Sequence, residues 1–552
     1  MALSDTPSVT NYVRRFSASA VVIGNHVYID GGEITQYVNG SSTFENQGRY
    51  TNQVNSTLSL DLRKSWTTSD VVFRSIPKQG PIKTNVVLWP DRARNAFYSW
   101  GGNFAFGLNK TKPELWRFNA DGGGGGKWVL ESASNPEVFN GLTSAGSMAY
   151  TTVNNTGYAI GGHATSLTTL GREEDNGQSK QAIPGMLTYN FDTREWTNET
   201  ASTGFSPFHT LTGASAHYVP NFGPGGLVFV LGGHLLDIDR DYPLANSPAQ
   251  TFDNLTFFDP AAKKTYFQRA TGDIPSLPRA DSCVEGFQNT EGGYEILLFG
   301  GVNRATRNND KYHDAYILSL PGFVWTKLPA PNYGARAYHS CVAVGKRQIL
   351  SIGGMRTTGT DKDRAPQGLL LFDMTEWRWM DVYDTTLGAY ERHKNITAWY
   401  AEGGLEKVQW SSDEVKGMFV NEGPGGGGPG EQEPSGSSTP VGAIAGGTIG
   451  GIVGLAAILG LLWFIIRRKR KHSEDGPERH TESQDASPMT RPPQQPAEVS
   501  SDSANTVMEK RPIYTGHAEL PPKPAHAELP PNQIPGFAAE LDGSQRGGRP
   551  FS

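Results

Sequence analysis

The chain is poor in cysteine, has no excess of basic residues and lacks a hydrophobic segment at its N-terminus. Two cysteines, Cys283 and Cys341, occur among 552 residues, which excludes a scaffold built on many disulfides but leaves a single bridge open. The net charge is -6, so we expect no nucleic-acid partner. The first residues, MALSDTPSVTNYVRRF, contain no apolar core of a signal peptide.

Charged residues are also absent from one long stretch, residues 441–466. A helix of about 20 apolar residues crosses a bilayer, and uncharged runs of this length are rare in soluble chains, where the alternative would be a buried core helix. Five basic residues follow at 467–471, and basic clusters stay on the cytoplasmic side. We therefore predict a single-pass protein of the plasma membrane, with residues 1–440 outside and residues 467–552 in the cytoplasm.

The glycosylation sequons agree with this orientation, because all seven precede the predicted helix. The missing signal peptide conflicts with it. Three explanations stay open: an upstream segment missing from the sequence, an unconventional route of export, or a cytoplasmic N-terminal domain. The sequon asparagines are Asn39, Asn55, Asn109, Asn154, Asn198, Asn254 and Asn395.

Glycine and aromatic residues are abundant, with 66 Gly, 25 Phe, 20 Tyr and 12 Trp, which is typical of a turn-rich all-β domain. Six times an apolar run ends in a Gly-Gly dyad, and an alternating run with an aromatic residue follows. The dyads are Gly31-Gly32, Gly101-Gly102, Gly161-Gly162, Gly232-Gly233, Gly300-Gly301 and Gly353-Gly354, and the aromatic residues are Trp66, Trp128, Trp196, Phe267, Trp325 and Trp377.

This repeat predicts a β-propeller. Each unit holds about four short strands, and stacking the units around an axis buries the sheet faces that one unit alone would expose. We expect each dyad to end an inner strand, where neighbouring backbones leave no room for a Cβ, and each aromatic ring to fill the space between sheets. The predicted domains are an extension (1–13), the propeller (14–420), a Gly/Pro-rich stalk (421–440), the membrane helix and the tail. Six dyads predict six blades, with a seventh closing blade over residues 395–410 as the alternative.

The repeat resembles that of the kelch family over residues 14–383. The best-matching units are ARAYHSC (335–341) with QILSIGG and LLLFDMTEW, and PRADSC (278–283) with ILLFGG. The second to fourth units lack the matching first strand, which weakens their boundaries. The whole layout also resembles membrane-anchored kelch proteins of filamentous fungi, and this similarity implies a protein that faces the cell surface or the cell wall.

Kelch propellers include copper-radical oxidases, which need a Tyr crosslinked to a Cys, a second Tyr and two His. In this chain both cysteines occupy matching positions on the first strands of adjacent blades, so we expect them to be structural and predict no enzyme and no cofactor. They form either a disulfide between neighbouring strands or two buried thiols. His163 and His234, each following a dyad, could meet a third ligand from Asp237, Asp239 or Asp241, but the spacing lacks the Gly and Glu of a calcium loop and we predict no metal.

Residues 421–440 cannot bury a core and are expected to form a flexible stalk, and the Pro-rich tail is expected to be disordered. The tail carries a PxxP motif at Pro521–Pro524, which either docks a proline-reading domain or lies in an inert spacer. In the membrane helix small residues recur every four positions, which indicates either a homodimer or mere tolerance of glycine in membranes. This stripe is Gly442, Gly446, Gly450 and Gly454.

Together these features predict a non-enzymatic, membrane-anchored surface protein whose propeller binds a protein or polysaccharide. The alternatives are an intracellular scaffold held on a membrane and, less in keeping with the cysteines, a copper-radical oxidase. The ligand itself is not identified by any motif.

Overall fold

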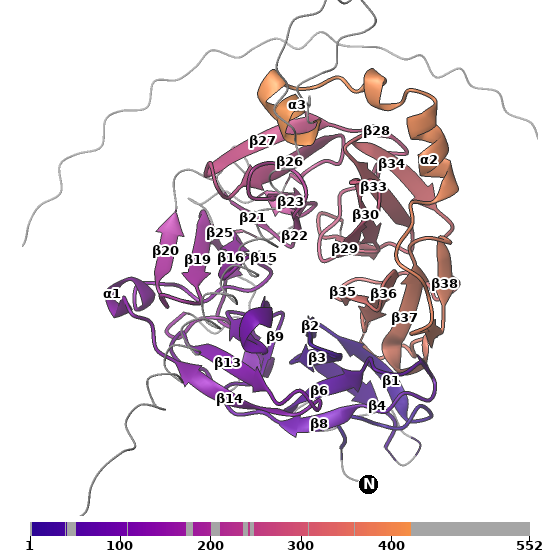
Figure 1. The fold of residues 1–552 in the computed structure, drawn as a ribbon. Coiled ribbons are helices and arrows are strands. Elements are labelled where there is room, and N and C mark those ends of the chain that lie inside the picture. Colours follow the sequence, from indigo (N-terminus) through magenta and orange to yellow (C-terminus); the bar gives the residue numbers. More distant parts are fainter. Residues whose placement is uncertain are drawn as a thin grey trace, which may run out of the picture. The chain divides into compact units, whose positions relative to one another are not determined.

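The protein is described by a computed structural model over residues 3–38, 40, 51–107, 109–172, 180–199, 210–235, 241–242, 248–306, 309–357 and 359–420. Within these residues the fold is all-β and β-propeller-like: six mainly antiparallel sheets surround one axis (Figure 1). We call these sheets blades 1 to 6 in chain order. In each blade the strands run outward from the axis in chain order, except that the short β28 of blade 5 precedes the inner strand in the chain and lies at the outer edge.

The strands of the first three blades are β2 (Ser19–Ile23), β3 (His26–Asp30), β6 (Ser56–Asp61) and β8 (Arg74–Pro77) in blade 1; β10 (Val87–Asp91), β11 (Ala96–Trp100), β13 (Leu115–Ala120) and β14 (Gly126–Glu131) in blade 2; and β15 (Ala149–Val153), β16 (Thr156–Ile160), β19 (Met186–Asn190) and β20 (Trp196–Glu199) in blade 3.

The strands of the last three blades are β22 (Ser215–Val219), β23 (Leu227–Leu231), β26 (Asn254–Asp259) and β27 (Lys264–Arg269) in blade 4; β29 (Cys283–Gln288), β30 (Tyr294–Phe299), β33 (Ala315–Leu320), β34 (Val324–Leu328) and the short parallel β28 (Thr271–Gly272) in blade 5; and β35 (Ser340–Val344), β36 (Gln348–Ile352), β37 (Leu369–Asp373) and β38 (Arg378–Met380) in blade 6.

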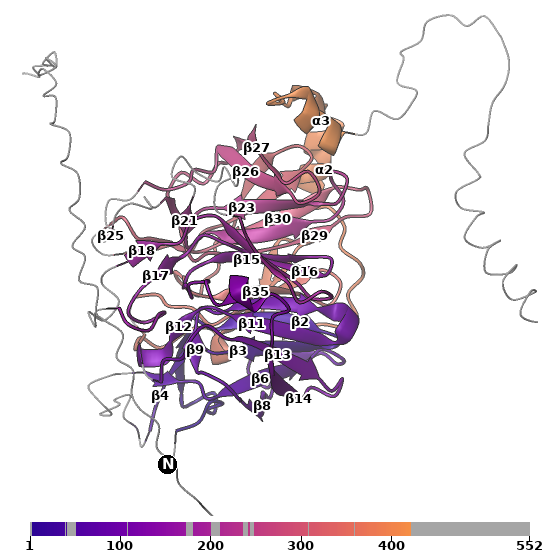
Figure 2. The same cartoon turned by 90° about the vertical axis from the view of Figure 1, so that its left-hand side faces the viewer.

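Small sheets flank these blades, and Figure 2 shows β4, β9, β12, β17 and β18 together on one side of the molecule. We call this side the dyad face, because the Gly-Gly dyads lie there. The small sheets are β1 (Tyr12–Phe16) with β4 (Glu33–Gln36) and β5 (Asn52–Gln53), β9 (Lys83–Thr84) with β12 (Asn103–Phe104), β17 (His163–Ala164) with β18 (Lys180–Ala182) and β25 (Asp241–Tyr242), β21 (Leu211–Thr212) with β24 (His234–Leu235), β31 (Val302–Asn303) with β32 (Asp310–Lys311), and, joining blades 1 and 6, β7 (Trp66–Thr67) with β39 (Val382–Tyr383).

Each Gly-Gly dyad follows the second strand of its blade and touches the next blade. The second glycine donates its N–H to a carbonyl just ahead of the following inner strand: Gly162 to Leu211 at 2.7 Å and Gly233 to Arg279 at 2.8 Å are examples. A Cβ on Gly161 would lie 2.1 Å from that same Leu211 oxygen. All twelve dyad glycines have φ between 62° and 112°, which only glycine adopts without strain. Each dyad thus ends the second strand from the axis, not the innermost strand.

Blade 6 is joined to the N-terminal part of the chain, which closes the ring. Gly354 donates its N–H to the Arg15 carbonyl at 2.7 Å, and the Arg14 guanidinium donates to the Gly354 carbonyl at 2.8 Å. Further out, β39 pairs with β7, and the Gln367 amide donates to two carbonyls of the loop after β7. The closure thus uses hydrogen bonds between blades and an outer two-stranded latch.

The aromatic rings that separate the blades differ in part from those predicted. Trp128, Trp196 and Trp325 are buried between sheets, as the repeat suggested. Phe267 was wrongly assigned: it is 42% exposed and its neighbour Tyr266 is buried instead, because successive strand residues face opposite sides. Trp66 and Trp377 are only half-buried.

Two of these differences have a local cause. Trp377 lies in the turn before β38 with φ of 50° and stacks on His393, whereas Trp379, on the strand, packs against Phe372. Trp66 lies on the latch strand β7 and packs against Tyr383.

Residues 394–420 run outside the blades as helices, so the alternative of a seventh blade over 395–410 is wrong. His393 caps α2 (Lys394–Ala401) through its side chain, and Ile396 and Tyr400, four residues apart, lie on one helical face against blade 5. After η5 (Leu405–Lys407), α3 (Asp413–Phe419) inserts Phe419 among the aromatic rings of blades 4 and 5. The remaining helical segments are α1 (Pro136–Phe139), η2 (Arg92–Arg94), η3 (Ala105–Gly107) and η4 (Pro366–Gly368).

Among the described helices none has the length and apolar character needed to cross a bilayer. The predicted stalk, membrane helix with its glycine stripe, and tail all lie outside the described residues.

Candidate binding site in the central channel

The innermost strands β2, β10, β15, β22, β29 and β35 adjoin one another in a closed ring around the axis (Figure 1). Their inner edges have no further strand to pair with, so backbone N–H and C=O groups face the channel. A cavity of about 460 Å³ lies inside this ring and is lined by all six strands. Its volume is that of a small-molecule site.

The dyad end of the channel is bounded by a ring of six residues, which we call the collar. Each precedes an inner strand by two residues and has a positive φ of 50° to 71°. Backbone hydrogen bonds join neighbouring members, such as Asn85 N–H to the Ser17 carbonyl at 2.8 Å and Asp281 N–H to Gly213 at 2.8 Å. The collar consists of Ser17, Asn85, Ser147, Gly213, Asp281 and Tyr338.

Arg304 crosses this collar. Its guanidinium forms an ion pair with Asp281, lies 5.6 Å from the Tyr338 ring and donates to the Ser147 hydroxyl at 3.3 Å. Ser147 belongs to blade 3 and Tyr338 to blade 6, on opposite sides of the ring. The side chain therefore obstructs the dyad end of the channel and leaves a collar cavity of about 100 Å³.

The other end of the channel opens between the hairpins that join first and second strands. Exposed Arg92 and Pro220, both in such hairpins, line the cavity there. The α3 helix lies on this same face, because the Gly223 N–H of one hairpin donates to the Met418 carbonyl at 3.0 Å. A ligand would enter from this hairpin face.

Glu285, the third residue of β29, carries a carboxylate that lines the channel. One of its oxygens accepts from the Gly286 N–H at 3.0 Å and lies 3.7 Å from His217 Nδ1. Burial raises the pKa of Glu285 to about 7, and the backbone N–H groups of Gly286 and Ala343 and the charge of Arg92 offset only part of this effect. Burial also lowers the pKa of His217 to about 4, so this imidazole is neutral near pH 7.

His217 continues the contact to a third side chain. Its Nε2 lies 2.8 Å from the Tyr294 hydroxyl, so Tyr294, His217 and Glu285 form a line across blades 4 and 5. The three side chains come from β30, β22 and β29. Since the neutral His217 brings no positive charge, the carboxylate has no fixed counter-charge among its ion-pair partners in the described part of the chain.

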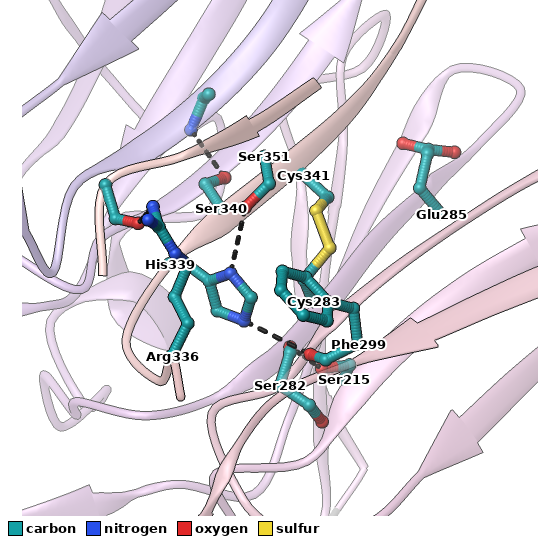
Figure 3. Close-up of a disulfide and its surroundings, with 12 residues drawn as sticks. Ser215, Ser282, Cys283, Glu285, Phe299, Arg336, His339, Ser340, Cys341 and Ser351 are labelled. Carbon is teal, nitrogen blue, oxygen red and sulfur yellow. Dashed lines mark hydrogen bonds between the residues drawn. A yellow bond between two sulfur atoms is a disulfide. The ribbon is translucent and has the colours of Figure 1, made fainter. Parts of the chain in front are cut away.

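Cys283 and Cys341 are joined in a disulfide between the inner strands of blades 5 and 6, with their Cα atoms 5.4 Å apart (Figure 3). Beside it lies His339, whose Nδ1 contacts the Ser351 hydroxyl at 3.0 Å and whose Nε2 contacts the Phe299 carbonyl at 3.2 Å. Burial, followed by the charge of Arg336, lowers the pKa of His339 to about 3.

The two sulfurs and His339 are close enough to hold a metal ion. They do not fit one in this state, because the sulfurs are bonded to each other and both imidazole nitrogens have partners. A thiolate, not a disulfide, is the metal ligand.

His163 and His234, which the sequence singled out, are not among the residues that line the channel cavity. His163 Nδ1 lies 2.7 Å from the Thr212 hydroxyl, and His234 Nε2 accepts from the Arg304 N–H at 3.3 Å; both imidazoles are buried. The side chains of Asp237, Asp239 and Asp241 are outside the described set, as is sequon residue Asn39. The remaining sequon asparagines, Asn55, Asn109, Asn154, Asn198, Asn254 and Asn395, are all exposed.

These geometries define the chain as an all-β, propeller-like protein with a central polar cavity. No protein-family model matches the sequence, and no curated protein matches it either. Among solved structures 407 chains match. One is the structure of YjhT, with 13% sequence identity and a TM-score of 0.45, which covers 69% of this chain and 100% of its own.

Proposed function

We propose that the chain is a non-enzymatic, membrane-anchored surface protein of the kelch type whose propeller binds a protein or glycan ligand. The observation that carries this proposal is the channel of about 460 Å³, which opens on the hairpin face and is obstructed by Arg304 at the other. A cavity walled by rigid strands is suited to recognition.

The kelch assignment is supported by contacts within the repeat. Arg279 of PRADSC donates to the carbonyl of Gly300 at 2.9 Å, and Arg336 of ARAYHSC donates to the carbonyl of Gly353. In both blades a motif arginine thus fixes the first glycine of its own dyad. The motif arginine therefore makes the same contact with the dyad in blades 5 and 6.

The disulfide favours a binding role over a copper-radical oxidase. The chain has two cysteines, and each bonds to the other, so neither sulfur is free to form a thioether to tyrosine. The anchor is the uncharged stretch 441–466 with the basic run after it, and the Gly442–Gly454 stripe would pair two such helices. In a crosslinking assay on membranes, the double variant Gly446→Ile, Gly450→Ile should lose the dimer band.

Binding is tested with the compact unit formed by residues 1–431, produced as a secreted protein and applied to glycan arrays and to intact cells. We expect saturable binding that the soluble unit itself competes away. Heat-unfolded protein is the control. Equal retention of folded and unfolded protein on every surface would contradict the proposal, and a propeller protected from protease on intact cells would favour the intracellular scaffold.

A further inference from the structure

We propose that the central channel binds a small organic cation, whose ammonium group pairs with the Glu285 carboxylate. This inference rests on the proposed binding function and names the chemical class of one ligand, taken in the channel itself. It follows from the position of one carboxylate in a cavity that is also lined by tyrosine rings and by uncharged titratable groups.

The first part is a carboxylate whose one ion-pair contact among the described residues is the neutral His217. The Glu285 side chain is 21% exposed, and its carboxylate accepts a hydrogen bond from the Gly286 N–H. The neighbouring His217 imidazole is neutral near pH 7. A buried carboxylate without a counter-ion is costly to ionise, and a bound cation would remove that cost. The ammonium group of the ligand would therefore supply the positive charge that pairs with Glu285.

The second part is an aromatic wall. Tyr150, Tyr218 and Tyr294 line the same cavity as Glu285. The Tyr218 hydroxyl donates to the Gly225 carbonyl at 2.9 Å and the Tyr294 hydroxyl contacts His217, so these polar ends are already engaged. Aromatic faces attract cations, and more strongly where water is excluded.

The third part is the charge of the remaining surroundings. The titratable groups that line the cavity from other elements are His217 and Tyr218 on β22, Tyr294 on β30, Tyr150 on β15 and His339 ahead of β35, and all are uncharged at pH 7 to 8. Among the described residues that line the cavity, Arg92 of η2 carries the fixed positive charge, at the exposed mouth. A ligand with an anionic end directed outward would meet Arg92, while a simple cation would not use it.

The cation site also has a pH dependence of defined sign. Only the ionised carboxylate pairs with an ammonium group, and Glu285, with a pKa of about 7, loses its proton near neutrality. Affinity for an ammonium ion that stays charged throughout should rise from pH 6 to pH 8. Below pH 7 it should fall up to tenfold per unit.

The experiment is calorimetric titration of the full-length protein in a non-ionic detergent at pH 8. The probes are choline, its uncharged isostere 3,3-dimethylbutan-1-ol, and glycine betaine, which adds a carboxylate to the same head group. We expect choline to bind and the alcohol to bind at least tenfold more weakly. Choline affinity should drop about tenfold between pH 8 and pH 6.

Three variants assign the effect. Glu285→Gln should lose choline binding at least tenfold, and Glu376→Gln, an exposed carboxylate on blade 6, should bind as the parent does. Arg92→Gln should weaken the binding of glycine betaine, whose carboxylate would lose its positive partner at the mouth of the channel. Thermal unfolding at pH 5 verifies that each variant is folded.

Two results would overturn the inference: no choline binding at 10 mM by the folded parent protein, or equal binding of choline and the alcohol by parent and Glu285→Gln. If the 1–431 unit still binds a glycan or cell surface in that case, the channel inference fails alone. If the channel binds choline but no surface ligand is found, the proposed function fails and the cation site stands.

Discussion

At the scale of single residues, backbone crowding at the dyads excludes any side chain larger than that of glycine. The place of a Cβ on Gly161 is taken by the Leu211 carbonyl, 2.1 Å away, and the φ of Gly161 is +62°. Gly161→Ala should destabilise the protein by about 2 to 4 kcal/mol, since both a clash and a left-handed backbone oppose the new methyl.

The measurement for Gly161→Ala is urea unfolding of the full-length protein in detergent, followed by tryptophan fluorescence. Gly388→Ala is the matched control, because nothing lies within 4 Å of its Cβ position and its backbone is not left-handed. An unchanged midpoint for Gly161→Ala would show that the blades separate easily at this contact.

Glu285 should reduce stability where it is ionised. Its folded pKa, about 7, is above its ordinary 4.5, so between these values the folded state binds more protons than the unfolded state. This contribution to stability therefore falls as pH rises from 4.5 to 7. Glu285→Gln should stabilise the protein by about 1 to 3 kcal/mol at pH 8 and much less at pH 5.

Unfolding of Glu285→Gln and the parent is compared at both pH values, with Glu376→Gln as the exposed control. A similar gain at pH 5 and pH 8 would mean that the ionisation of Glu285 carries no cost in the folded protein. The neighbouring His217 acts in the opposite sense, since its lowered pKa makes the protein lose stability as pH falls from 6.5 towards 4.

The sequence predicts part of this residue-level picture. The dyads were recognisable because only glycine fits their backbone. Glu285 and His217 were missed because the strand positions that line the channel become clear only once the collar residues, two positions before each inner strand, are known. Counted from the collar, both are the third residue of an inner strand, where the other blades carry Val21, Trp89, Thr151 and Val342. A titratable side chain at that position in two adjacent blades is the signal that could have found them.

At the scale of elements, the inner strands β29 and β35 depend on a covalent link. The disulfide encloses a sequence separation of 58 residues, for which the chain-entropy account gives about 4 kcal/mol of stabilisation. Cys283→Ala, Cys341→Ala and the double variant should all lose about this amount, and the three should agree because each breaks the same bond.

Unfolding with and without reductant measures the effect of this bond. Reductant should shift the parent towards the variants and leave the variants unchanged. Variants as stable as the oxidised parent would contradict a stabilising bridge.

Element boundaries were harder to predict than element type. The all-β prediction is confirmed, because turn residues and alternating runs are local signals. The segment 395–410 has strand-like residues, yet Ile396 and Tyr400 use a four-residue spacing to dock a helix on blade 5. The helix forms there because it packs on residues about eighty positions earlier in the chain. A local sequence pattern carries no information about that contact.

At the scale of the whole molecule, the proposed orientation across a membrane can be tested at the sequons. The six sequon asparagines that the structure describes are all exposed, and they are spread over several blades. If the propeller is outside the cell, glycosidase treatment of the expressed protein should shift its mobility, and each single Asn→Gln change should remove one glycan step at an occupied site.

The control is a variant with an N-x-T triplet added to the tail, within residues 480–500. That triplet should stay unmodified if the tail is cytoplasmic. A protein without any mobility shift, expressed in a host that glycosylates a reference protein, would place the propeller on the cytoplasmic side.

The ring closure has a consequence for folding during synthesis. Arg14 and Gly354 are 340 residues apart, so the N-terminal segment leaves the ribosome long before its partner on blade 6 exists. At about 5 to 20 residues per second this interval is about 20 to 70 seconds. Throughout it the inner strand β2 has no neighbour on one side, and nascent chains should need chaperone protection until the last blade emerges.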